Sequence, residues 1–196
     1  MEYPLQLSFK ILAMAPQIYV RDASGNTVCF VKQKMFKLKE AVTVFSNETK
    51  QNVLCTIQAD RILDWSANYH FRDAGGESFG SVRRKGMRSL WKAHYEVFDE
   101  SGNHSSTISE ENPMAKVADG LLGEIPIVGM FSGYLFHPKY LLTSAEDGQP
   151  KMRLTKQPAM WEGKYSLERM YDYDDVAELR GLMAFMMMSL LERARG

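Results

Sequence analysis

The sequence lacks an excess of charge of either sign and is poor in cysteine. Its 196 residues hold 24 Lys and Arg against 24 Asp and Glu, so the formal net charge is zero. A dedicated nucleic-acid-binding domain is usually clearly basic, so we expect no nucleic-acid partner. The two cysteines, Cys29 and Cys55, are too few for a disulfide scaffold, and both stand in apolar, strand-like runs. We expect them to be small buried hydrophobic residues.

Targeting segments and long hydrophobic runs are also lacking. Residues 1–4 do not begin a basic stretch followed by an apolar run, as a signal peptide would. Residues 125–136 and 181–191 are largely apolar, but each is well short of the roughly 20 residues that a membrane-spanning helix needs. We therefore expect a cytoplasmic protein, and we expect any membrane contact to be peripheral.

The motifs of common catalytic and cofactor sites are missing too. The sequence has no dinucleotide-binding or P-loop glycine pattern, no Cys-x-x-Cys, and four histidines without metal-ligand spacing. Residues 76–80 match the G-x-S-x-G pattern of hydrolases, with Ser78 as the nucleophile. That pattern needs a strand before it and a helix after it, whereas a hairpin turn precedes Ser78 and strand-like residues follow. We expect no catalytic residue, no metal and no cofactor, with a Ser78 hydrolase as a distant alternative.

Short strands that end in Asp, Gly or Asn are abundant. Four such turns separate strand-like runs, at residues 22–26, 73–76, 99–103 and 146–148. Glycine supplies the positive φ of a tight hairpin, and Asp or Asn bonds the turn backbone. Alternation such as that of Val53, Cys55 and Ile57 places one face of a strand against a core. The pattern predicts a run of antiparallel hairpins in a barrel or sandwich.

The C-terminal segment breaks this pattern and predicts a helix at about residues 174–193. Asp174 and Asp175 can cap its first turn, with Glu178 as the partner in a capping box. Residues 181–191 have no polar stripe, and a helix that is apolar on all sides must be buried on all sides. Since the run is too short to cross a bilayer, we expect the strands to enclose this helix.

Several short segments, spread over nearly the whole chain, carry a resemblance to a known family. They are residues 19–22, 25–26, 30–34, 98–99, 102, 121–126 and 163–165. With the Asp-Gly turns and the final apolar helix, they resemble the LURP-one-related proteins of the tubby C-terminal-like superfamily. The resemblance implies a mainly β fold: an antiparallel barrel of about twelve strands that encloses a hydrophobic C-terminal helix, with residues 1–196 as one domain.

The resemblance implies little about activity. The superfamily includes tubby-like proteins, which bind phosphoinositides, and phospholipid scramblases. The sequence matches neither the tubby phosphoinositide site nor a scramblase calcium segment, so no binding residue carries over. The LURP-one-related branch has no generally established biochemical activity, and it offers no catalytic motif that could be carried over.

The densest basic run is the candidate binding site. It comprises Arg83, Arg84, Lys85 and Arg88, with Lys92 nearby. Cations beside apolar side chains suit an anionic headgroup or a phosphate. We therefore expect a non-enzymatic module that binds anionic phospholipid or phosphate at a membrane surface. Successive strand residues point to opposite faces, so Arg83 and Lys85 would share one face and Arg84 would take the other.

A second interpretation stays open. The basic run can instead be a solvated strand whose charges guard a sheet edge against aggregation. The protein would then be a structural scaffold for protein partners, with no small ligand. A binding module should gather its basic residues in space, whereas a scaffold should present an exposed apolar patch.

Overall fold

The described part of the chain forms twelve strands and one helix in a computed structural model. This part comprises residues 1–10, 17–32, 41–61, 67–85, 93–111, 138–158, 163–172 and 174–193. The elements are β1 (Leu5–Lys10), β2 (Gln17–Arg21), β3 (Thr27–Lys32), β4 (Val42–Phe45), β5 (Val53–Ala59), β6 (Asn68–Asp73), β7 (Ser78–Arg84), β8 (His94–Phe98), β9 (His104–Glu110), β10 (Lys139–Ser144), β11 (Pro150–Gln157), β12 (Gly163–Arg169) and the helix α3 (Asp175–Arg193).

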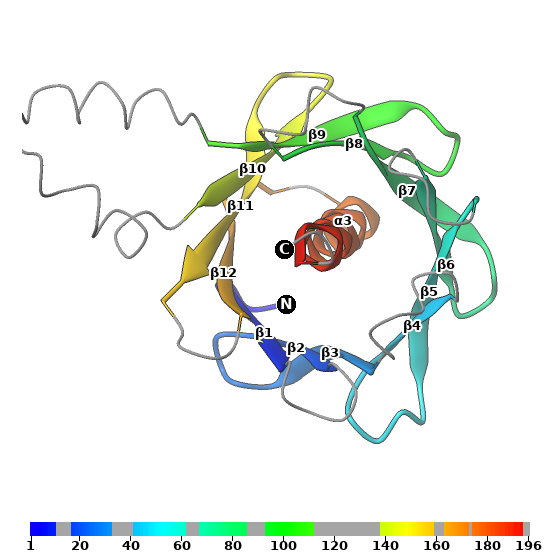
Figure 1. The fold of residues 1–196 in the computed structure, drawn as a ribbon, viewed down its shortest axis with the longest axis vertical. Helices are drawn as coiled ribbons and strands as arrows, with labels where there is room; N and C mark the ends of the chain where they lie inside the picture. The colour runs from blue at the N-terminus through cyan, green and yellow to red at the C-terminus, as the bar shows by residue number, and fades with distance from the viewer. Residues whose placement is uncertain are drawn as a thin grey trace, which may run out of the picture.

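The sheet closes on itself. Each strand pairs antiparallel with its neighbours in the sequence, and β12 returns to pair with β1. In this last pairing Leu5 lies opposite Leu167, and Leu7 lies opposite Tyr165. Figure 1 looks down the resulting barrel and shows the strands as a ring around α3. The predicted fold class, an antiparallel barrel that encloses a hydrophobic C-terminal helix, is confirmed.

The core consists of one face of every strand together with the helix. Each helix side chain from Leu182 to Met188 is at most 1% exposed, which confirms that the helix is buried on all sides. Cys29 and Cys55 are free and buried, as expected. The thiol of Cys55 lies 3.4 Å from the sulfur of Met183. No helix among the described residues is long and apolar enough to cross a membrane.

The start of α3 confirms the predicted cap and corrects the predicted capping box. The Asp174 Oδ1 accepts a hydrogen bond of 2.9 Å from the backbone N–H of Ala177, so Asp174 is the N-cap. The third helical residue is therefore Ala177 and not Glu178, which removes the partner that a capping box needs. Glu178 is 3% exposed and reaches Arg169 of β12 instead, with 3.4 Å between Oε2 and Nη1.

The hairpin turns use the predicted chemistry. Asp22 accepts the backbone N–H of Asn26 at 2.9 Å, and Asp99 accepts that of Asn103 at 2.8 Å. Gly25 and Gly102 have φ values of 84° and 81°, in the region that side chains avoid. The turns at residues 22–26 and 99–103 therefore form the same hydrogen bond.

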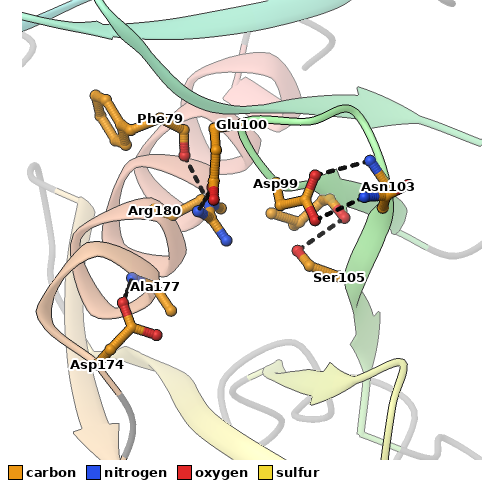
Figure 2. Close-up of polar contacts among 9 residues, drawn as sticks. Phe79, Asp99, Glu100, Asn103, Ser105, Asp174, Ala177 and Arg180 are labelled. Carbon is orange, nitrogen blue, oxygen red and sulfur yellow. Dashed lines mark hydrogen bonds and ion pairs between the residues drawn. The ribbon is translucent and has the colours of Figure 1, made fainter.

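One buried cation ties α3 to the barrel wall. Arg180 is 8% exposed, and its Nε donates a hydrogen bond of 2.6 Å to the carbonyl oxygen of Phe79 in β7. Its Nη2 lies 2.5 Å from Oε2 of Glu100, in the turn between β8 and β9 (Figure 2). A buried guanidinium needs such partners, because an unpaired charge in the interior is very costly. The contact fixes how far along the barrel axis the helix sits.

Gly80 makes room for this contact. Its φ is 139°, and a Cβ at this position would lie 2.5 Å from the Phe98 carbonyl oxygen and 2.7 Å from the Arg180 Nε. Any side chain would therefore strain the backbone and push the guanidinium away.

Replacing Gly80 with alanine should lower the free energy of unfolding by about 2–4 kcal/mol, because it adds backbone strain and displaces Arg180. Denaturant unfolding measures this loss. Gly25→Ala is the matched control, since Gly25 also has a positive φ but has no atom within 4 Å of the added Cβ. The control should lose only the left-handed backbone cost of about 1–2 kcal/mol. Equal losses in the two variants would contradict the role assigned to the Arg180 contact.

Candidate functional site

The basic run lies at the C-terminal end of β7 and splits between the two faces of the barrel. The side chains of Arg83 and Lys85 are 45% and 60% exposed, whereas that of Arg84 is 6% exposed. This is the alternation expected for a strand. Arg88 and Lys92 lie outside the described residues.

Glu96 of β8 stands between the two outward cations. Its Oε2 is 2.7 Å from Nη2 of Arg83, its cross-strand partner, and its Oε1 is 2.9 Å from Nζ of Lys85. Hydrogen bonds from Arg83 and then from Lys85 lower the pKa of the Glu96 carboxyl to about 2. The carboxylate therefore stays ionised at neutral pH and holds both cations in place.

The Arg84 side chain is buried and contacts the helix inside the barrel. Its Nη2 is 3.6 Å from Oε1 of Glu192, near the end of α3, and its Cζ is 5.9 Å from the ring centroid of Tyr95. The Tyr95 hydroxyl donates a hydrogen bond of 2.5 Å to the same carboxylate oxygen. Arg84 thus holds the last turn of α3 against the barrel wall, and an external anion meets chiefly Arg83 and Lys85.

A surface hollow of about 480 Å³ surrounds this end of β7. Four cations and two carboxylates line it, so its lining is net positive: Arg61, Arg83, Arg84, Lys85, Asp60 and Glu96. We call it the basic hollow. Both of its carboxylates are paired, since Asp60 lies 3.3 Å from the Nε of Arg61 and Glu96 takes the two β7 cations.

Sequence reasoning missed Arg61 and Glu96. Glu96 could have been found, because it alternates with buried Tyr95 and Val97 and so shares the outer face of the β7–β8 hairpin. Arg61 follows the end of β5 and belongs to no period-two pattern, so no local signal points to it.

Residues 27–120 of the chain match the family model described as LURP-one-related. Over this region the chain is similar to the LURP-one-related proteins. The matched region contains the basic hollow and every strand from β3 to β9. An X-ray structure of a protein from Arabidopsis thaliana is similar in fold, with a TM-score of 0.50 and 11% sequence identity, over 93% of this chain and 89% of that chain. No curated protein matches the sequence.

The hydrolase alternative does not fit this barrel. Ser78 is the first residue of β7 and is exposed, and the chain continues from it as a strand to Arg84. A nucleophile elbow instead turns directly into a helix, which strains the serine and exposes its hydroxyl. Among the described residues, no group of three His, Cys, Asp or Glu side chains could hold a metal ion.

The stability that Glu96 provides should depend on pH. Its pKa is about 2 in the folded protein and 4.5 for an unperturbed carboxyl, so the ion pairs stabilise fully above pH 4.5 and weaken as the pH falls towards 2. Glu96→Gln should cost about 1 kcal/mol or less at pH 7, because Arg83 and Lys85 are solvent-exposed. The difference between wild type and variant, measured by denaturant unfolding, should shrink between pH 4.5 and 3. A difference that stays constant over that interval would contradict the assignment.

Proposed function

We propose that the protein is a non-enzymatic binding module that takes a phosphate-bearing anion in the basic hollow. The observation that carries this proposal is the gathering of four cations from β5–β6 and β7 around one hollow that holds two carboxylates. Arginine binds phosphate through a planar fork of N–H donors, and lysine adds a compact point charge. The outer face of the β7–β8 hairpin presents one donor of each type, the guanidinium of Arg83 and the ammonium of Lys85.

Glu96 sets the strength of this binding. An anion in the hollow must share Arg83 and Lys85 with a carboxylate that already lies within 2.9 Å of each. Each cation near an anionic surface is worth about 1 kcal/mol. We therefore expect weak, reversible binding that falls as salt rises.

The described surface gives less support to the scaffold interpretation. The large apolar side chains that it exposes come from the N-terminus, β5, the segment after β12 and the first turn of α3: Met1, Val53, Tyr171 and Val176. Such single exposed residues are usual on any globular protein. A phosphate can come from a lipid headgroup or from a soluble molecule, and the experiment below separates these sources.

Reversing both outward cations, with Arg83→Glu and Lys85→Glu, should reduce phosphate-type binding at least tenfold. Calorimetry with inorganic pyrophosphate tests the soluble source, and sedimentation with phosphatidylserine-containing vesicles tests the lipid source. The control reverses Lys139 and Lys164, which are exposed on β10 and β12, and should bind as the wild type does. Arg83→Gln with Lys85→Gln repeats the test without new repulsion at Glu96. Wild-type protein that binds neither probe at low salt would overturn the proposal.

Glu96→Gln should act in the opposite direction. It releases both cations without changing the shape of the hollow, so affinity for the probe that binds should rise about five- to tenfold, close to 1 kcal/mol. The thermal midpoint should change little. Unchanged or weaker affinity in this variant would show that the anion does not bind at Arg83 and Lys85.

A further inference from the structure

A second hollow continues the basic one along the outer side of the barrel. It measures about 360 Å³ and extends over β6 and β7 to the turn between β8 and β9. Asn68 and Arg83 line both hollows, so the two are neighbours that share a boundary. The rest of its lining includes Phe98, Asp99 and Glu100. We call it the acidic hollow.

The two hollows have opposite charge. The acidic hollow has two carboxylates, Asp99 and Glu100, against the single shared cation Arg83. Glu100 is held from inside by Arg180, yet its side chain is 58% exposed and its charge still faces solvent. Arg83 lies at the boundary: it pairs with Glu96, which lines the basic hollow, and its Cζ lies 4.9 Å from the ring centroid of Phe98, which lines the acidic hollow. The joined groove is therefore positive at one end and negative at the other.

An unused acceptor marks the boundary between the hollows. The Asn68 Oδ1 is buried and has no hydrogen-bond partner, although the backbone of Asn68 is paired with Asp60 through both its N–H and its carbonyl. Buried polar atoms are nearly always bonded, and an amide oxygen at this place suits an N–H donor. Asn68 lines both hollows, so a ligand that spans them would pass this residue.

We infer that the groove binds a short extended peptide that carries an acidic or phosphorylated residue and, further along, a basic residue. This inference rests on the proposed function, since the acidic or phosphorylated residue would take the basic hollow. The basic residue would lie by Glu100, and a backbone N–H would bond to Asn68 Oδ1. Each hollow has the size of a site for a ligand well beyond a single phosphate.

Charge favours a peptide over a bilayer as the occupant. An anionic membrane presents one sign of charge, so the acidic hollow would be repelled from the surface that attracts the basic hollow. A peptide can present both signs. Among the described strands, each of β6 to β9 is paired with a neighbour on both sides, so these strands offer no free edge for strand addition and recognition depends on side chains in the groove.

The test uses labelled alanine–glycine peptides with one phosphoserine and one lysine at varied spacing. Fluorescence anisotropy compares each peptide with the same peptide in which alanine replaces lysine, and with competing inorganic pyrophosphate. At the best spacing, lysine should improve affinity at least fivefold. Asn68→Ala should lower the affinity for that peptide about fivefold and leave the affinity for pyrophosphate unchanged. Glu100→Gln keeps an oxygen for Arg180 and should abolish the preference for lysine, with thermal melting as the check on folding.

Each outcome decides between the two proposals. If pyrophosphate binds at Arg83 and Lys85 but the lysine raises the affinity of no peptide, the peptide inference fails and the proposed function stands. If pyrophosphate, the vesicles and every peptide all fail to bind, both proposals fail. If phosphatidylserine vesicles bind more tightly than every peptide, and Asn68→Ala and Glu100→Gln leave that binding unchanged, the ligand is a membrane and the inference is overturned.

Discussion

The closure of the barrel around α3 is the constraint on which the rest of this structure depends. Once β12 pairs with β1, every inward side chain must find a neighbour inside the ring. Empty space there would forfeit dispersion contacts and leave cavities, which are costly. A helix that is apolar from Leu182 to Met188 fills that space on all sides at once. The strands and the helix therefore specify each other.

β7 connects this interior to the candidate site. On its inner side, the Phe79 carbonyl and Arg84 hold the two ends of α3 through Arg180 and Glu192. On its outer side, Arg83 stands at the boundary of the two hollows. A strand alternates its side chains, so one short segment can serve both faces without conflict. The site is thus built on a rigid element, which limits the entropy lost when a ligand binds.

Most of the charged side chains that line the groove already form ion pairs within the protein. Glu96 holds Arg83 and Lys85, Asp60 holds Arg61, and Arg180 holds one oxygen of Glu100. The pairs made by Glu96 and Asp60 involve exposed cations and contribute little stability, but they keep long side chains in defined positions. A ligand would exchange one set of partners for another, so its affinity would be modest and its charge pattern would decide specificity.

Local sequence determined the turns, several strands and the helix, because their causes are local. Asp22 and Gly25 fix a hairpin by their own hydrogen bonds and φ, and a helix without a polar stripe must be buried. The number of strands came from the family resemblance, since the local pattern did not define β1, β4 or β12. Alternation along β7 also sufficed to separate Arg83 and Lys85 from Arg84.

Tertiary structure decided what these residues meet. The pairing of Glu96 with both cations depends on the β7–β8 register, and the approach of Arg180 to Phe79 joins residues 101 positions apart. Asn68 and Glu100 enter the groove only because β6, β7 and β8 lie side by side. The spacing of these two residues in the sequence does not predict that they lie in one groove. Long-range contacts follow from strand order and barrel closure rather than from local preference.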